Sequence, residues 1–502
     1  MDKMQSIDCN LVNICQLGLE INPMIVSQQY NLDRATYAVD VVTSEFDPVL
    51  FSAADFSRSG VNLNELDQRS QLIGNMLNTD VYQLSGGLSK KLNTGVTVRT
   101  SMEFQRTSDN IPVSAYNEYV GSHTGVNTTS INASFSQPLL RLSGKGYNNA
   151  LIDLAQADVV IEKSFLEFNT SEQLQNMALA YWQYFADYQR IDVYQANVQR
   201  VNRVLEITTE LVHANKKPAS DLIQIQADLL DKERQVISAK QSLYASKQNL
   251  ARFIGVSEKD VSLIGAPSDQ FPSVDEIEIR DLQGVLQLSL VHRSDVHALY
   301  HQRDKSEILV KRAENESKPS LDLVGSLSYG GSDLGNGIHR IVSPLVKDDG
   351  RNYRIGMGVR YNIPIGNHRA EANLLISKNN ELNQDLIYDN QIRNIEINVS
   401  IEYSNLLNSI EAVNKSKRTL EYYDEVFENE QLKFKNGLST ILNLIIFQER
   451  LTFAQLEYLF NQQQLAMTIT RLRHQTGTLL QKNEGEITIN DKSVFYQLPL
   501  AK

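Results

Sequence analysis

Cysteine is scarce in this sequence, so covalent cross-links contribute little to the fold. Cys9 and Cys15 are the two cysteines among 502 residues. They lie six positions apart in a segment that we expect to be helical, where their side chains would not approach closely enough for a disulfide. The residues before Cys9, Ser6-Ile7-Asp8, do not resemble the small-residue stretch that precedes a lipid-modified cysteine. We therefore predict neither a disulfide nor a lipid anchor.

Long hydrophobic runs are also missing. The longest, ILNLIIF at 441–447, is much shorter than the roughly 20 residues of a membrane-spanning helix. No basic and then apolar leader opens the sequence, because polar residues interrupt its beginning. If the protein is exported, we expect a signal peptide upstream of Met1. A role in a membrane would have to come from β-strands.

Clustered positive charge and catalytic motifs are absent as well. The net charge is −12 and Lys and Arg are scattered, which argues against a nucleic-acid partner. Without a Gly-rich phosphate loop, nucleophile elbow or paired-cysteine motif, we expect neither an enzyme nor a cofactor. His297 and His301 have the spacing of two metal ligands on a helix, but Ala298 takes the place of the glutamate of a metalloprotease helix. We expect these histidines to lie on the surface or in packing contacts, without a metal.

An internal repeat is the main feature that the sequence does contain. In each half a helical segment ends at a proline, Pro48 or Pro319, that begins an extended segment. A second proline in each half, Pro138 or Pro364, closes a strand and opens helical periodicity over roughly 70 residues, or about 100 Å of helix. The sequence thus predicts two copies of one plan with very long helices.

Each long helix then reverses direction at a matching turn. The first turn begins at Asn215 in NKKPASDLIQIQADL, and Gly437 takes the corresponding place in NGLSTILNLIIFQERL. Asn and Gly readily adopt the left-handed conformation at a helix end. We expect Pro218 in the first turn of one returning helix and Ser439 as the N-cap of the other.

Both returning helices carry an apolar residue at every seventh position, which predicts a left-handed coiled-coil seam. The seam residues are Leu222, Leu229, Val236, Leu243 and Leu250, and Leu444, Leu451, Tyr458, Leu465 and Leu472. We accordingly divide the chain into a first repeat, a second repeat and an equatorial tail. The first repeat is 1–265, with a helix, strands within 48–138, a long helix 145–214 and a returning helix 218–254; the second is 266–476, with a helix 285–316, strands 319–330 and 353–364, a long helix 366–435 and a returning helix 439–476; the tail is 477–502.

Four segments alternate between apolar and polar residues, as strands with one face in an apolar medium do: 95–105, 129–137, 321–329 and 354–363. Their length suits tilted strands that cross a bilayer, and the polar loops 106–128 and 330–353 suit its external side. Four strands cannot close a barrel, so several chains must share one. The segments 49–57 and 81–90 predict an additional hairpin whose place the pattern leaves open.

Together these features resemble the outer-membrane efflux proteins of the TolC type. The resemblance is carried by the order and duplication of several motifs: P-x-L at Pro48 and Pro319, QPLLR at 137–141, ARFIG at 251–255, LVHRSDVHAL at 290–299, and the two turns. It implies a mainly α-helical chain with transmembrane β-structure, assembled as a homotrimer in the outer membrane of a Gram-negative bacterium. Each subunit would add four strands to a twelve-stranded barrel, continued by an α-helical coiled-coil barrel through the periplasm. Residues 255–284 and the tail would form an equatorial belt.

The resemblance also implies that the two turns form the periplasmic end of a duct, where they gate it and contact an adaptor protein. The residues concerned are Asn215, Lys216, Lys217, Asp221, Gly437, Ser439 and Asn443. Asp221 keeps the aspartate found six residues after the turn in many relatives, whereas Asn443 takes its place in the second half, so we expect no carboxylate ring there. Two simpler roles stay open: Asp221 could interact with the positive end of its helix, and Lys216 and Lys217 could be solvated.

The polar face of the strands would line the barrel lumen, with Arg99, Glu103, Arg354 and Arg360 in contact with water and solute. The predicted function is an outer-membrane exit duct of a tripartite efflux or type I secretion system. Its partners would be the outer-membrane lipid, the adaptor and an inner-membrane pump of the RND or ABC class. The alternative is a soluble, elongated coiled-coil scaffold whose strands pack on each other. The sequence does not identify the cargo.

Overall fold

The computed structural model describes residues 7–67, 69–111, 125–277, 281–347, 351–483, 486–489 and 492–498. The chain divides into two compact units, each built from separate segments. We call them the helical unit, Met1–Arg34, Val159–His301 and Asp385–Lys502, and the strand unit, Ala35–Asp158 and Gln302–Gln384. Each unit takes residues from both halves of the sequence, so the two predicted repeats do not coincide with compact units.

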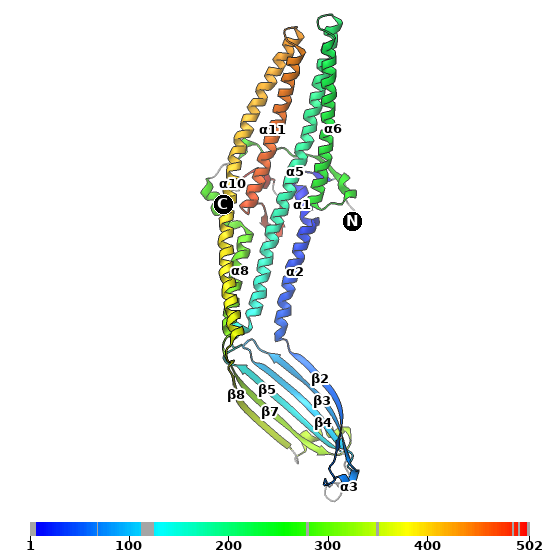
Figure 1. Cartoon of the computed structure of the whole chain (residues 1–502), viewed down its shortest axis with the longest axis vertical. Coiled ribbons are helices and arrows are strands. Elements are labelled where there is room, and N and C mark those ends of the chain that lie inside the picture. The colour runs from blue at the N-terminus through cyan, green and yellow to red at the C-terminus, as the bar shows by residue number, and fades with distance from the viewer. Residues whose placement is uncertain are drawn as a thin grey trace. The chain divides into compact units, whose positions relative to one another are not determined.

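A six-stranded antiparallel sheet forms the centre of the strand unit (Figure 1). Its order along the sheet is β2 (Val49–Asn62), β3 (Met76–Lys91), β4 (Thr97–Asp109), β5 (Val126–Pro138), β7 (Ser320–Leu334) and β8 (Arg351–Asn362). Short helices accompany the sheet: α3 (Ser70–Ile73), α4 (Lys145–Asn148), α9 (Ser343–Val346), and the 3-10 turns Ser44–Phe46 and Ile338–Ile341.

The sheet has six strands and not the four that were expected, because the additional hairpin belongs to the same sheet. The strand-like segments 49–57 and 81–90 lie in β2 and β3, which pair from Val49 with Ser89 to Asn62 with Met76. β3 in turn pairs with β4 along nearly its whole length. The strands also extend into the predicted loops 106–128 and 330–353; residues 112–124 and 348–350 of these loops lie outside the described residues.

The register gives the sheet one apolar and one polar face. One row of partners crosses all six strands as Leu50, Leu88, Thr100, Ala133, Leu327 and Ile355. Its two outermost members, Leu50 and Ile355, are 83% and 73% exposed in the single chain. The next rows on this face add Leu84, Met102, Phe104, Ile131, Tyr329 and Tyr353. A broad apolar face is therefore exposed.

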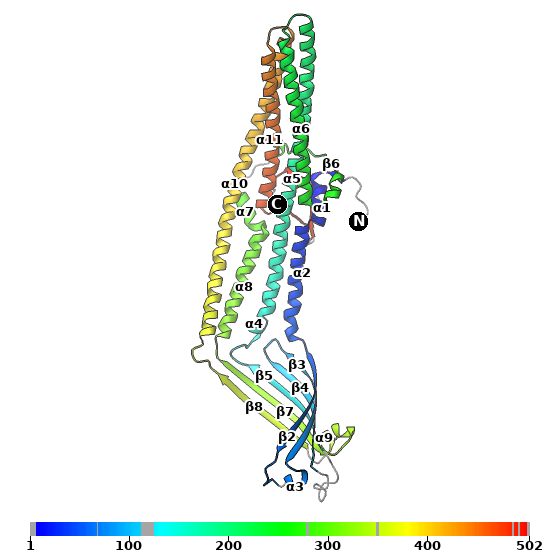
Figure 2. The same ribbon diagram turned by 45° about the vertical axis from the view of Figure 1, so that its right-hand side comes forward.

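The helices follow the predicted plan with small shifts in their bounds. They are α1 (Leu11–Ile21), α2 (Pro23–Thr43), α5 (Ala150–His213), α6 (Ser220–Ile254), α7 (Leu282–His292), α8 (Ser294–Glu316), α10 (His368–Lys435) and α11 (Ile441–Gln475). In the helical unit α5 and α6 form one antiparallel hairpin, and α10 and α11 form another (Figure 2). Within the described residues, no helix has the length and hydropathy required to cross a membrane.

The single helix expected over 285–316 is interrupted at Arg293, between α7 and α8. Arg293 has extended backbone angles, φ −74° and ψ 120°. Its buried guanidinium pairs with Asp295 at 2.8 Å and donates to the Gln475 Oε1 atom at 2.7 Å. Because a buried charge needs such partners, this pairing favours the break over a continuous helix.

The main core of the helical unit surrounds Trp182 of α5, and we call it the Trp182 core. Residues from distant parts of the chain enter it, among them Cys9, Cys15, Leu250, Ile264, Leu479 and Phe495. Small pairings complete it: β1 (Ile7–Cys9) lies parallel to β6 (Ile264–Pro267), β9 (Gln481–Asn483) pairs with β10 (Glu486–Thr488), and the tail ends in α12 (Ser493–Tyr496). Turns at Glu258–Leu263 and Val274–Glu276 lie in the same stretch of chain.

One of the two cysteines differs from expectation in position, while Cys15 lies in helix α1 as expected. Cys9 lies in strand β1, not in a helix, and both cysteines are buried in the Trp182 core. As predicted, no disulfide joins these two described residues. Burial strongly raises the pKa of the Cys15 thiol, with a smaller contribution from Asp269, so this side chain acts as a small apolar group.

Candidate functional site

The first helical end connects α5 to α6 through residues 214–219. Asn215 has a φ of 54°, the left-handed conformation predicted for it. The Lys216 N–H closes the end of α5 by donating to the Leu211 carbonyl at 2.8 Å. The helix α6 begins only at Ser220, so Pro218 precedes its first turn. Among the described residues no side chain caps this start, and Asp221 is the acidic residue of its first turn.

The second helical end connects α10 to α11 through residues 436–440. Gly437 has a φ of 77°, as predicted. The expectation that Ser439 caps α11 is wrong: the Thr440 hydroxyl accepts from the Asn443 N–H at 3.3 Å. Ser439 is instead buried and donates to the Glu430 carboxylate. Since α11 begins at Ile441, Ser439 lies one position too early to cap it.

The two helical ends contact each other through Lys217. Its ammonium donates to the Ser439 carbonyl at 2.7 Å and lies 5.0 Å from the centre of the Phe434 ring. Lys217 is half-buried, so its predicted solvated role does not hold in this chain. The other predicted residues of the two ends stay at the surface: Asn215, Lys216, Gly437 and Asn443 are exposed and Asp221 is half-buried.

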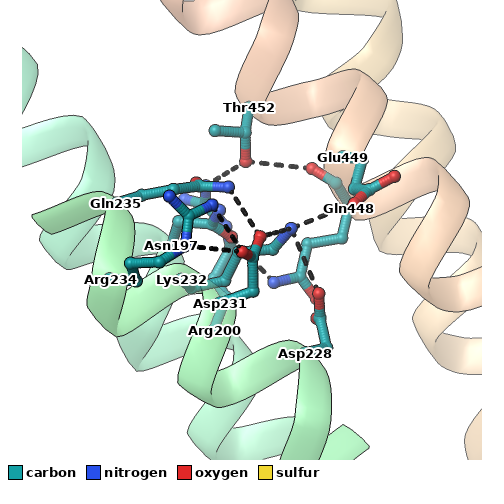
Figure 3. Close-up of polar contacts among 10 residues, drawn as sticks. All are labelled: Asn197, Arg200, Asp228, Asp231, Lys232, Arg234, Gln235, Gln448, Glu449 and Thr452. Atoms are coloured by element: carbon teal, nitrogen blue, oxygen red, sulfur yellow. Dashed lines mark hydrogen bonds and ion pairs between the residues drawn. The ribbon is translucent and has the colours of Figure 1, made fainter. Parts of the chain in front are cut away.

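A polar cluster around the buried side chain of Lys232, which the sequence analysis missed, joins the two helical hairpins (Figure 3). We call it the Lys232 cluster; its members are Asn197, Arg200, Asp228, Asp231, Lys232, Arg234, Gln235, Gln448, Glu449 and Thr452. Lys232 of α6 is 3% exposed. Its ammonium lies 3.1 Å from Asp228 of the same helix and 3.0 Å from Glu449 of α11.

The charges of this cluster are stabilised mainly by each other. Burial opposes the charge of Lys232, but hydrogen bonds to Glu449 and Asp228 outweigh it and raise the pKa of the ammonium. Burial raises the pKa of the Asp228 carboxyl in spite of the hydrogen bond from Lys232. Lys232 thus stays charged in a buried position only while Asp228 and Glu449 remain beside it.

Neighbouring amides extend the cluster but leave it incompletely bonded. The Gln448 side chain donates to the Asn197 Oδ1 atom at 2.7 Å, and Arg200 donates to Thr452 at 3.3 Å. Four buried polar atoms of the cluster nevertheless have no hydrogen-bond partner in the described part of the chain: Asn197 Nδ2, Arg200 Nε, Asp228 Oδ2 and Gln448 Oε1. Unsatisfied buried groups carry a free-energy penalty, so this junction is packed less favourably than an apolar one.

The heptad pattern contains a signal that could have revealed Lys232. Ile225, Lys232, Ala239 and Ser246 are all buried and lie seven residues apart, three positions after the predicted seam residues of α6. Lys232 therefore occupies a core position of the coiled coil. A charged residue in such a position fixes register at a cost in stability.

A second feature missed from the sequence is an apolar stripe on the opposite side of α6. Ile223, Leu230, Ile237 and Tyr244 are also seven residues apart, and each is 65–69% exposed. Ile446, Phe453 and Phe460 make a similar exposed series on α11. Exposed apolar residues in heptad spacing are typical of helices that pack on a further helix.

The predicted lumen residues all lie on the polar face of the sheet. Arg99 is in register with Ser134, Ser326 and Gly356, and this row places it on the same face as Arg354 and Arg360. Glu103 lies on this face too, and it accepts a hydrogen bond from Gln83 at 3.0 Å. The Arg99 guanidinium stacks 4.0 Å from the centre of the Phe51 ring, which the sequence analysis did not foresee.

Comparison with known proteins gives one family and several similar folds. The family described as outer membrane efflux protein matches residues 14–256 and 285–478. The outer-membrane channel OprN is 15% identical, covering 93% of this chain and 90% of that one with a TM-score of 0.67. The Campylobacter jejuni CmeC outer membrane channel is 13% identical, covering 96% of this chain and 87% of that one with a TM-score of 0.65. The Vibrio cholerae outer membrane protein VceC is 15% identical, covering 93% of this chain and 96% of that one, also with a TM-score of 0.65. A search of curated protein sequences finds no match. At these identities the structural matches establish the fold.

Proposed function

The chain belongs to the outer membrane efflux protein family, and from this premise we propose that three copies enclose one duct, supplied by an adaptor protein and an inner-membrane pump. The protein is an outer-membrane exit duct of a Gram-negative bacterium.

The exposed apolar face of the sheet is the observation that carries the proposal. A face that carries Leu50, Leu84, Met102, Ile131 and Ile355 on three neighbouring rows of the sheet would be unstable in water. In a bilayer the same face contacts hydrocarbon, while the polar face contacts the aqueous lumen. The soluble scaffold would have to bury this face, and in the described residues the exposure of Leu50 and Ile355 speaks against that.

The exposed stripes of α6 and α11 support assembly into an oligomer. Each stripe repeats every seventh residue, so each can form a coiled-coil seam with a helix of a neighbouring copy. Edge strands in lipid also require pairing with another chain. Family resemblance selects three copies among the possible numbers.

We assign opening of the duct to separation of the hairpins α5–α6 and α10–α11. These hairpins are held together near their ends by an apolar cluster that includes Val204, Phe434 and Leu444. Polar contacts add to it, among them Lys217 with the Ser439 carbonyl and Lys232 with Glu449. At the polar contacts, water replaces the lost partners when the hairpins separate. Opening of this kind rearranges coiled-coil packing and needs no covalent chemistry.

Docking of the adaptor provides the free energy for this separation. Lys216 and Asn443 are exposed at the two ends and are available to a partner, whereas Lys217 contacts its own chain. The pump, of the RND or ABC class, selects the cargo. The family name favours efflux over secretion as the process.

The test is a measurement on purified full-length protein from outer membranes. Native mass spectrometry in detergent is expected to give a trimer, and planar bilayers are expected to show channels that open more often in Glu449→Gln than in wild type. Glu411→Gln, which removes an exposed carboxylate from an i,i+4 pair on α10, is the matched control and should behave like wild type. Recovery of a monomer from the aqueous fraction would overturn the proposal.

A further inference from the structure

We propose that this protein forms a wider membrane barrel than its family resemblance implies, with six strands from each subunit. In a trimer, three copies of a six-stranded sheet give 18 strands. The free edge of β2 in one copy would pair with the free edge of β8 in a second copy of this chain. The inference rests on the proposed trimeric duct and adds the size and the seam of its membrane portion.

The hairpin β2–β3 is an integral part of the sheet by its hydrogen-bonding register. β3 pairs with β4 from Thr79 with Asp109 to Lys91 with Thr97, as extensively as β5 pairs with β7. β2 pairs with β3 without a break in register. The hairpin is therefore not a loop that lies over the sheet.

Both faces of the sheet continue across the hairpin. On the apolar face Leu50 and Leu84 are exposed and extend rows that include Ala133 of β5 and Phe104 of β4. Farther along this face the exposed Phe56 packs on Tyr82, in a row that continues to Arg106 of β4. On the polar face Ser85 is paired with Glu103 and Ser89 with Arg99. A hairpin outside the bilayer would not need this division, so the pattern places β2 and β3 in the membrane wall.

Close packing also fits the hairpin to its neighbour. Phe51 of β2 lies over Gly87 of β3, where an added Cβ atom would come within 2.7 Å of the Phe51 ring and 2.1 Å of the Thr100 carbonyl oxygen. The Arg99 guanidinium of β4 stacks on the same ring. Glycine at position 87 thus lets an aromatic ring of β2 reach across β3 to β4.

The two free edges are complementary. Among the described strands β2 is paired only with β3, and β8 only with β7. Strand directions alternate through all six, so β8 of one copy and β2 of the next would run antiparallel, and their lengths of 12 and 14 residues match. Lipid does not tolerate open edges, and a second copy satisfies both at once.

The consequence is a larger passage through the membrane. With strands about 4.8 Å apart and tilted by about 40°, 18 strands give a backbone diameter of about 36 Å, against about 24 Å for 12. Barrels of 16 to 18 strands leave an aqueous channel.

Cross-linking between paired cysteines tests the seam. Ser57→Cys on β2 is combined in turn with Arg354→Cys, Gly356→Cys and Gly358→Cys on β8, because the register between copies is to be found by scanning. The expected result is an oxidant-dependent ladder of dimers and trimers for a β2–β8 pair. Ser101→Cys on β4, on the same face, is the matched control and should give no ladder with the same partners.

The outcomes separate this inference from the proposed function. A trimer by native mass spectrometry whose β8 cysteines link to β4 would mean a twelve-stranded barrel and would overturn the inference alone. A monomer would overturn the proposed function as well. Spin labels at Leu84→Cys and Gln83→Cys, neighbours on opposite faces of β3, give an independent check: oxygen dissolved in the bilayer should relax the label at 84 more than that at 83. Equal relaxation at both positions would place the hairpin outside the membrane wall and overturn the inference.

Discussion

The Trp182 core and the Lys232 cluster lie in the same helical unit and hold it together by opposite means. At Trp182 aromatic rings from distant segments pack on one another: Phe271 at 5.6 Å and Tyr496 at 5.8 Å between ring centres. At Lys232 the contacts are ionic and amide groups, and four buried polar atoms lack partners among the described residues.

This difference shows how one fold can be stable in one part and separable in another. Moving apart the apolar groups of the Trp182 core exposes hydrocarbon to water, which is unfavourable over the whole exposed area. Moving apart the groups of the Lys232 cluster returns charges and amides to water, which offsets much of the loss. This difference supports the proposal that the Trp182 core stays closed while the hairpins separate at the Lys232 cluster.

The largest effect is expected from removing the central ring of the Trp182 core. Trp182→Ala should lower the free energy of unfolding by about 4 kcal/mol, because a large cavity replaces a fully buried side chain. Denaturant unfolding of the detergent-solubilised protein, followed by circular dichroism, measures it. Trp182→Phe keeps a ring and should lose much less; equal losses in the two variants would contradict the packing argument.

A smaller and more local effect is expected at the Lys232 cluster. Lys232→Ala leaves the buried Asp228 carboxylate without its partner and should cost about 3 kcal/mol locally. Hydrogen exchange should accelerate in the first turns of α6 and α11 while the Trp182 core keeps its protection.

A double variant sharpens the same comparison. Lys232→Met with Asp228→Leu replaces the buried pair by apolar groups of similar size and should be neutral or stabilising. If this variant exchanged as fast as Lys232→Ala, the polar nature of the junction would not be what allows it to open.

The third effect depends on pH and concerns His474, which is buried near Arg293. Burial, and after it the charge of Arg293, lowers the pKa of His474 from 6.5 to about 4. The unfolded chain therefore binds a proton at this residue between pH 6.5 and pH 4 while the folded chain does not, so stability is full above pH 6.5 and falls as the pH is lowered.

Between pH 7 and pH 4.5 this group should contribute a loss of about 2 kcal/mol. His474→Gln, which can keep the polar contact with Ser171, should show a correspondingly flatter pH dependence in denaturant unfolding. An unchanged slope would mean that His474 is protonated in the folded protein.

The smallest effect compares the two helical ends. Thr440→Ala removes the side-chain cap of α11 and should destabilise its first turn by about 1 kcal/mol. Ala219→Ser at the start of α6 should gain less than about 0.5 kcal/mol, because residue 219 has helical and not extended backbone angles. Exchange rates at 441–444 and 220–223 measure both; a larger gain at 219 than loss at 440 would contradict the capping geometry.

Local patterns predicted much of this fold. The left-handed turns at Asn215 and Gly437 followed from residue type, and the alternation of 95–105 gave both the strand and its face. The hairpin of β2 and β3 was visible as a pattern, but its position was not, because register between distant strands depends on tertiary pairing. For the same reason the sequence could not show that Lys232 of α6 meets Glu449 of α11.

The predicted N-cap of α11 was wrong for a more local reason. Ser439 and Thr440 are both good N-cap residues, and the choice between them depended on burial of Ser439 beside Glu430, which sequence alone does not reveal. Arg293 is similar: it falls within the predicted helix 285–316, whereas its buried pairing with Asp295 and Gln475 accompanies a break in that helix.

The Trp182 core also sets an order of events during biogenesis. Tyr496 covers Trp182, and Lys492 reaches Asp269, the carboxylate that accepts from the Leu11 N–H at 2.6 Å and the Tyr181 hydroxyl at 2.6 Å. The core contains segments that are synthesised early, and it can therefore pack completely only after the C-terminal segment with Lys492 and Tyr496 has been synthesised. In a chain truncated before residue 492, Trp182 would be less well covered, and proteases of the cell envelope would degrade the incompletely folded protein.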